Sequence, residues 1–142
     1  MTQREQLVEL INKLFIYTDT QDWDGLTKNV FDEIVFLDMS SLGGPAENFS
    51  ATDICNMWKE GFKDLDSVNH LGGNYLVKIT SVNEADIFAY ATATHYKASA
   101  TNGHTREFVG TYELKARRID SQWKIYSFVY NLKYMTGNTE LK

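Results

Sequence analysis

The spacing of hydrophobic residues changes near residue 68, and this change constrains the fold more than any other feature of the sequence. Before it, apolar residues recur every three or four positions, as on an amphipathic helix; after it, they alternate with polar residues, as on a strand. Helices followed by a run of strands imply an α+β fold. We expect the helices to pack on one face of a curved antiparallel sheet, with a pocket between the two layers.

Capping signals mark the starts of three helices. Thr2 and Glu5 have the spacing of a capping box, and the apolar positions after them carry a helix to Thr18. Asp22 and Ser50 stand where the N-caps of two further helices are expected. The predicted helices cover about residues 2–19, 22–30 and 50–62.

Five strands are predicted from β propensity and from alternation. They cover residues 33–38, 68–80, 84–99, 105–119 and 122–134, with turns such as Asn102-Gly103 between the last four. The last four strands should pair antiparallel. Between residues 87 and 95, alternate positions place a row of alanines on the same face as His95, which leaves room for a ligand.

The last predicted strand alternates between two faces. One face carries Trp123, Ile125, Ser127 and Val129. The aromatic residues of the other face are Tyr126, Phe128 and Tyr130. We expect these aromatics to lie on an exposed outer face, which predicts a homodimer or higher homo-oligomer through the sheet, because large apolar patches seldom remain in contact with water.

Composition limits the class of protein. The 142 residues are 43% hydrophobic, enough for one domain over residues 1–142 with a sizeable core. The net charge is -5, and the only basic run is the short segment 115–118, so no nucleic-acid partner is expected. Neither a signal peptide nor a membrane-spanning run is present, which predicts a cytoplasmic protein. The single cysteine, Cys55, has no disulfide partner and is expected to pack as a small hydrophobe.

An aspartate and two histidines are the candidate reactive groups. Asp19 ends the first helix at the edge of its apolar face, so its carboxylate should point inward. His70 lies near the start of a predicted strand, and His95 lies within another. If the fold brings them together, the site can move protons near neutral pH without a cofactor, because free imidazole titrates in that range.

Three segments carry a resemblance to a known family. They are Asp19-Thr20-Gln21-Asp22-Trp23-Asp24, His70-Leu71-Gly72-Gly73-Asn74 and Arg118-Ile119-Asp120-Ser121-Gln122-Trp123-Lys124. With the order of elements, they resemble the SnoaL-like family of the nuclear-transport-factor-two-like superfamily, and scytalone dehydratase is the member with the most similar motifs. This resemblance implies a cone of three helices wrapped by a strongly bent antiparallel sheet. It also implies a dehydratase, isomerase or cyclase that works without metal or cofactor.

The resemblance assigns roles to particular residues. Asp19 and His70 match the catalytic aspartate and histidine of the dehydratase, and His95 matches the region of its second histidine. His70 would act as the base, Asp19 would orient it, and His95 would protonate a leaving hydroxyl or return the proton elsewhere. The candidate donors to a developing oxyanion, and so the candidate substrate-binding residues, are Tyr17, Trp58, Tyr112 and Lys133.

The sequence also departs from the dehydratase. Thr18 and Met39 stand where that enzyme has two tyrosines, and Tyr112 replaces an asparagine, so a different substrate is expected. The substrate class predicted here is a small, largely apolar hydroxy-carbonyl compound.

Two alternatives remain open at this level. Two histidines and a carboxylate also suit an iron or zinc site, although no dedicated metal motif is present. A non-catalytic module that binds a small molecule or serves assembly is the second alternative, since a fold does not determine function.

Overall fold

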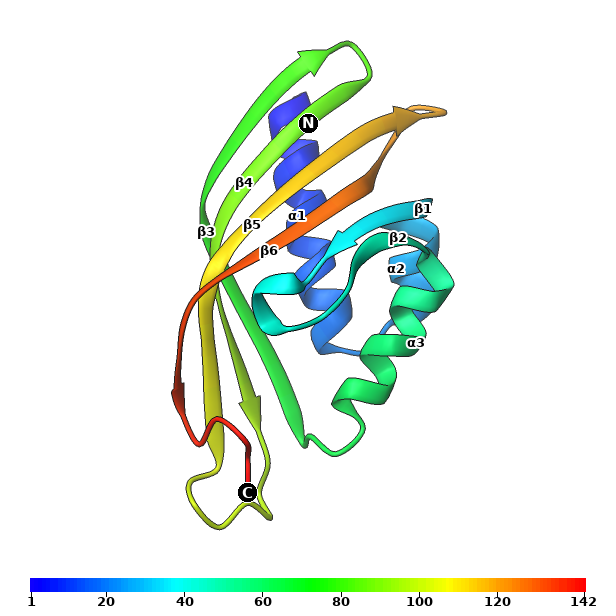
Figure 1. The fold of residues 1–142 in the computed structure, drawn as a ribbon. Coiled ribbons are helices and arrows are strands. Elements are labelled where there is room, and N and C mark those ends of the chain that lie inside the picture. The colour runs from blue at the N-terminus through cyan, green and yellow to red at the C-terminus, as the bar shows by residue number, and fades with distance from the viewer.

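The computed structural model describes residues 1–142, and its elements follow the predicted α+β order (Figure 1). The helices are α1 (Gln3–Asp19), α2 (Trp23–Asn29) and α3 (Ala51–Phe62), with a single 3-10 turn, η1 (Ser40–Leu42). The strands are β1 (Phe31–Asp38), β2 (Ala46–Ser50), β3 (Ser67–Ser81), β4 (Glu84–Tyr96), β5 (Thr105–Ile119) and β6 (Gln122–Gly137).

The six strands form one open sheet in the order β2-β1-β6-β5-β4-β3. The four long strands pair antiparallel, as predicted, whereas β1 pairs with β6 in parallel. The sheet is strongly bent, and the three helices lie on its concave side (Figure 1). Strand β2 was not predicted: its side chains are mostly exposed, so it shows no alternation of apolar and polar residues.

The predicted helix starts are confirmed by hydrogen bonds. The Thr2 hydroxyl accepts from the Glu5 backbone N–H, and the Glu5 carboxylate accepts from the Thr2 N–H, which completes the capping box of α1. Asp22 and Ser50 cap α2 and α3 through the backbone N–H groups three residues later. Helix α1 ends at Asp19 and α2 begins at Trp23, and it is α1 that lies against β3.

Small residues allow α1 to pack closely on the sheet. The apolar face of α1 is buried in a core shared with β4, where the predicted face of alternate alanines points inward. Gly72 of β3 lies so close to α1 that an added Cβ would come within 2.5 Å of a ring carbon of Phe15. The close approach brings the C-terminal turn of α1 against the middle of β3.

A β-bulge overturns the predicted faces of the last strand. The β5–β6 register shifts where Ala116 pairs with Ile125 and Lys115 pairs with Ser127, so Tyr126 is the extra residue. Beyond the bulge the alternation is inverted, and Phe128 and Tyr130 point inward and are buried. The expectation that these two aromatics lie on an exposed outer face is therefore wrong.

The outer face of the sheet exposes other apolar side chains. Leu71 and Leu76 of β3 are 74% and 69% exposed, and Tyr90 and Tyr134 are also exposed. The homo-oligomer stays a prediction, and it no longer rests on the aromatics of β6. No helix has the length and hydropathy needed to cross a membrane.

We predict that Gly72→Ala lowers the free energy of unfolding by about 1–3 kcal/mol, because the new methyl group would displace the Phe15 ring from a packed core. The matched control is Gly73→Ala, since an added Cβ there meets no atom within 4 Å. Urea unfolding followed by fluorescence measures both variants. Equal stabilities for the two variants would contradict the proposed tight contact.

Candidate active site

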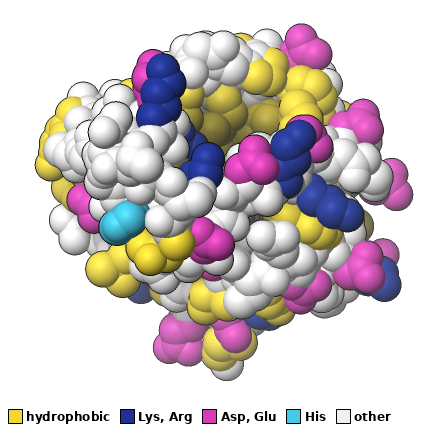
Figure 2. Space-filling view, turned by 90° about the horizontal axis from the view of Figure 1, so that it is seen from below, with side chains coloured by type: hydrophobic (Ala, Val, Ile, Leu, Met, Phe, Trp, Pro, Cys, Tyr) yellow, Lys and Arg dark blue, Asp and Glu magenta, His cyan; other side chains and the backbone are white.

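A pocket of about 170 Å³ opens between the helices and the concave face of the sheet. Eleven of its fourteen lining residues are hydrophobic, and most of these are aromatic. The lining residues are Leu14, Phe15, Thr18, Met39, Leu42, Trp58, Phe62, His70, Ala93, His95, Phe108, Tyr112, Phe128 and Tyr130. Seen from below, the molecule shows a recess lined by hydrophobic side chains with charged side chains beside it (Figure 2).

Asp19 and His70 are in direct contact at this pocket. The Asp19 Oδ1 atom lies 2.6 Å from His70 Nδ1, and Asp19 Oδ2 accepts from the His70 backbone N–H at 2.8 Å. Their side chains are only 15% and 11% exposed. One carboxylate therefore holds both the ring and the backbone of the same histidine.

The contact arises from the ends of two elements. Asp19 is the last residue of α1, and Phe15, one turn earlier, stacks on the His70 ring with 5.4 Å between centroids and 6° between planes. His70 pairs with Ala93 in the neighbouring strand, which fixes its backbone. A turn of helix thus presents one aromatic ring and one carboxylate to the same imidazole.

The carboxylate determines which ring nitrogen of His70 carries the proton. An ionised carboxylate only accepts hydrogen bonds, so the neutral imidazole donates from Nδ1 and keeps its lone pair on Nε2. No protein atom bonds to Nε2, and the ring is part of the pocket wall. His70 therefore presents a basic nitrogen to the pocket.

His95 lies on the same pocket wall but in a different environment. It is 8% exposed and is packed between Phe62 and Phe108, while Arg106 Nε donates to its Nδ1 at 3.1 Å. Burial, then the Arg106 charge and then His70, lowers the pKa of His95 to about 3. His95 is thus an uncharged imidazole near neutral pH, which does not fit the expected role of charged acid.

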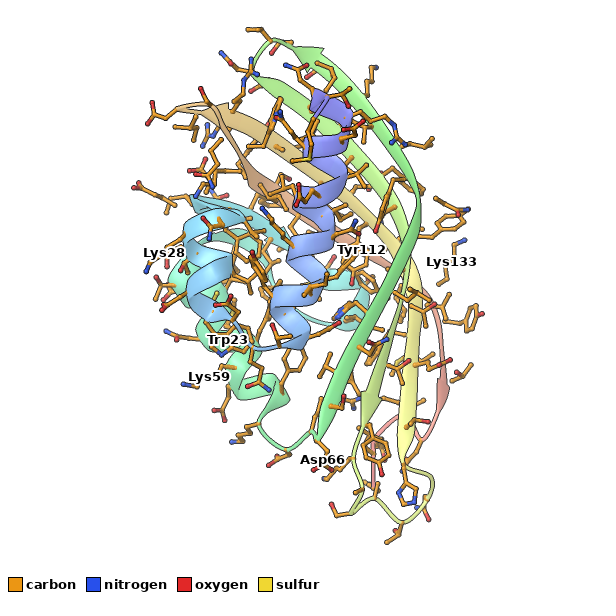
Figure 3. The ribbon with its side chains drawn as sticks, turned by 180° about the vertical axis from the view of Figure 1, so that it is seen from behind. Trp23, Lys28, Lys59, Asp66, Tyr112 and Lys133 are labelled. Atoms are coloured by element: carbon orange, nitrogen blue, oxygen red, sulfur yellow. The ribbon has the colours of Figure 1, made fainter.

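The four expected substrate-binding residues separate into two pairs. Trp58 and Tyr112 line the pocket, and burial raises the pKa of Tyr112 strongly, with smaller effects from Tyr130 and Asp19. Tyr17 and Lys133 do not line it: Tyr17 packs against α2, and Lys133 lies over the Tyr90 ring on the outer face. Figure 3 shows Tyr112 between α1 and the sheet and Lys133 on the other side of the sheet.

Tyr130 is a polar pocket residue that the sequence analysis did not place at the site. The hydroxyl of Tyr130 is buried and has no hydrogen-bond partner, although buried polar groups are rarely left unpaired. Burial raises its pKa to about 12, so the phenol is neutral and can donate. The bulge at Tyr126 turns Tyr130 inward, and alternation alone does not reveal this.

The side chains at this site do not form a cluster of metal ligands. No group of three or more His, Cys, Asp or Glu side chains lies close enough together to hold a metal ion. Thr18 and Met39, which the family resemblance places at two tyrosine positions, both line the pocket. The Thr18 hydroxyl already donates to the Leu14 carbonyl at 2.6 Å, so it has no proton left to donate to a ligand.

Comparison with known proteins identifies a family and several similar folds. A family model described as a SnoaL-like domain matches residues 1–129. The Kfla4162 protein of Kribbella flavida has a TM-score of 0.90 at 22% identity, over 97% of this chain and 95% of that one. No curated protein matches this chain at a significant level of sequence similarity.

Two further structural neighbours are named as elimination enzymes. A scytalone dehydratase candidate from Novosphingobium aromaticivorans has a TM-score of 0.81 at 15% identity, over 94% of this chain and 86% of that one. The hexachlorocyclohexane dehydrochlorinase LinA-type3 of Novosphingobium barchaimii has a TM-score of 0.76 at 14% identity, over 94% and 88%. At these identities the likeness concerns the fold alone.

The low pKa of His95 predicts a specific dependence of stability on pH. Between pH 6.5 and about 3 the unfolded chain binds a proton on this imidazole that the folded protein excludes, so the contribution of His95 to stability is lost as the pH falls through that range. The slope is at most about 1.4 kcal/mol per pH unit.

His95→Asn removes the titrating group while its amide oxygen can still accept from Arg106. The difference in free energy of unfolding between the wild type and this variant should therefore shrink between pH 7 and pH 4, as measured by urea unfolding. His104→Asn, in an exposed loop, controls for the loss of an imidazole elsewhere. If the free energy of unfolding falls equally with pH in the wild type and in His95→Asn, the lowered pKa of His95 is contradicted.

Proposed function

This chain belongs to the SnoaL-like domain family, and on that premise we propose that it is a lyase or isomerase that abstracts a proton next to a carbonyl group with His70 as the base. The observation that carries the proposal is the 2.6 Å contact between His70 Nδ1 and Asp19 Oδ1 on the wall of an apolar pocket. Neighbours of this fold named as a dehydratase and a dehydrochlorinase are consistent with that reaction class.

In the proposed reaction His70 Nε2 takes the proton, and the electron pair of the C–H bond moves toward the carbonyl oxygen. Asp19 stabilises the imidazolium that forms, because its carboxylate already accepts from Nδ1. The enolate oxygen requires a donor, and we propose the Tyr130 hydroxyl for this role: it is buried and has no partner within the protein, so it donates once the ring turns toward the ligand. Such groups act best in a pocket from which water is excluded.

The proton then leaves His70 by one of two routes. In an elimination, the enolate electrons form a C=C bond, the C–O bond of a β-hydroxyl breaks, and the His70 imidazolium supplies the proton that converts the departing hydroxide to water. In an isomerisation, the same proton is delivered to another carbon. His95 is uncharged near neutral pH, so in both routes the proton comes from His70.

The pocket also defines a class of substrate. No lysine or arginine lines it, so it lacks a counter-charge for a carboxylate or phosphate. Its aromatic walls and volume of about 170 Å³ suit a small, flat and uncharged body. We therefore propose a small hydroxy-carbonyl compound of largely apolar character as the substrate.

The alternative is a binding module of the same fold without catalysis, favoured by a pocket in which eleven of fourteen residues are hydrophobic. A binding module and an enzyme differ in one direct observation. Only an enzyme with this base exchanges the α-hydrogens of a bound ketone with solvent.

We predict that the wild type catalyses deuterium exchange into members of a panel of small cyclic ketones and hydroxyketones in D₂O, followed by NMR. His70→Ala and Asp19→Asn should each lower that rate by about 10²-fold or more, because the base is lost or loses its oriented tautomer. His104→Ala and Asp24→Asn, exposed residues of the same types, are the matched controls. Ligand binding without exchange in the wild type would favour the binding module instead.

Tyr130→Phe should have opposite effects on stability and affinity. Removing an unpaired buried hydroxyl should leave the free energy of unfolding unchanged or slightly higher. Affinity for a ketone that exchanges should fall by about 3- to 10-fold, since one hydrogen bond contributes about 0.5–1.5 kcal/mol. Calorimetry and urea unfolding measure the two quantities. A loss of stability without a loss of affinity would show that the hydroxyl has a partner within the protein.

A further inference from the structure

Arg106 lies behind the pocket wall and is held there by three contacts. It stands opposite His95 in the pairing of β5 with β4, and its Nε donates to His95 Nδ1 at 3.1 Å. Its Nη1 donates to the Thr139 carbonyl at 3.1 Å, and the guanidinium lies 5.4 Å from the centroid of the Phe108 ring. Arg106 does not itself line the pocket.

The chemistry of the guanidinium constrains the imidazole. Arginine has five N–H donors, no acceptor, and a charge that it keeps in proteins. The Nδ1 atom of His95 must therefore supply a lone pair, and the single proton of a neutral imidazole must lie on Nε2. Protonating Nδ1 would set two donors and two positive charges against each other. No protein atom bonds to Nε2.

The two histidines of the pocket are thereby set in opposite tautomers. At His70 a carboxylate, which only accepts, puts the proton on Nδ1 and leaves a lone pair on Nε2. At His95 a guanidinium, which only donates, does the reverse. Two residues of the same type thus present opposite groups to one cavity: His70 an acceptor and His95 a donor.

We propose that Arg106 is a positioning residue that fixes His95 as the neutral Nε2–H tautomer, so that His95 holds a substrate oxygen by a hydrogen bond while His70 acts on the neighbouring C–H bond. The tautomer follows from the protein alone, whereas its use in catalysis rests on the proposed function. A carbonyl oxygen accepts from this N–H, whereas a cationic group finds no acceptor there.

The environment of His95 agrees with this assignment. Only Arg106 and His70 carry ionisable groups that act on it, and the rings of Phe62 and Phe108 pack against it, the first edge-to-face and the second tilted. Burial in this aromatic setting and the Arg106 charge both lower the pKa of His95. An imidazole that does not titrate near neutral pH keeps one tautomer over the whole range in which His70 is needed as a neutral base.

The test is long-range ¹H–¹⁵N correlation NMR of the protein labelled with ¹⁵N-histidine, which distinguishes the two neutral tautomers and the imidazolium. In the wild type at pH 8, we expect Nε2–H at His95 and Nδ1–H at His70. In Arg106→Leu, His95 should become a mixture of tautomers and its pKa should rise, while His70 is unchanged. Arg106→Lys, which keeps a donor-only cation, should restore the Nε2–H form at least in part.

A second control separates the tautomer from the C-terminal tether, because Arg106 also binds Thr139. Asn138 holds the same segment through the carbonyls of Gly103 and Lys142. Asn138→Ala should loosen that segment without changing the His95 tautomer. If Arg106→Leu does not fold, the wild-type spectrum and Arg106→Lys still decide the matter. A wild-type His95 that is protonated on Nδ1 near pH 7 would overturn the proposal.

The same samples distinguish this inference from the proposed function. For a ketone that the wild type exchanges, Arg106→Leu should raise KM by about 2-fold or more, since only part of the His95 population then presents Nε2–H, and Arg106→Lys should bring KM back toward the wild-type value. If the wild type shows the expected tautomers but no deuterium exchange, the proposed function is refuted, whereas the assigned role of Arg106 in fixing the tautomer is not. Exchange by a wild type in which neutral His95 carries its proton on Nδ1 would refute the proposed role of Arg106 but not the proposed function.

Discussion

The carboxylate of Asp19 connects the architecture of this protein to its chemistry. It ends α1, where the helix dipole disfavours a negative charge, and it is largely withdrawn from water, so it requires strong donors. The backbone and the ring of His70 both supply one. The two hydrogen bonds join the end of a helix to a strand near its start, and they also orient the imidazole. A substitution that spares the fold but loses one of these bonds therefore changes the orientation of the His70 ring before it changes the architecture.

The apolar cavity depends on where the chain places small and large side chains. Alanines on β4 and Gly72 on β3 let α1 approach the sheet, whereas aromatic residues farther along the strands keep the layers apart. The wall is therefore made of rings, which resist collapse into the space because they are rigid and already packed against one another. In such surroundings the few polar atoms that face the cavity interact strongly with a ligand and weakly with water.

Local signals in the sequence predicted the helices and the long strands, because caps and periods are properties of neighbouring residues. The pairing of Asp19 with His70 came from the family resemblance of their two motifs, because the contact joins residues far apart in the chain. Strand β2 was not predicted because its mostly exposed residues show no alternation of apolar and polar side chains. The faces of β6 were predicted the wrong way round beyond Tyr126, because the bulge there depends on pairing with β5. Because of that inversion, the sequence analysis placed Tyr130 on the wrong face of the sheet. The contact between Arg106 and His95 depends on the register of two strands, which the hydrophobic pattern does not specify to the residue. The roles of these residues stay predictions, as does the oligomeric state.

The polar atoms of the pocket differ in whether the protein already determines what they can do. His70 has a carboxylate behind it and His95 a guanidinium, so each presents one defined nitrogen to a ligand. Tyr130 has no such partner, and its hydroxyl remains free to rotate toward either an acceptor or a donor. Under the proposed function, His70 would act on the C–H bond, and the substrate oxygen would accept from His95 Nε2–H and from the Tyr130 hydroxyl.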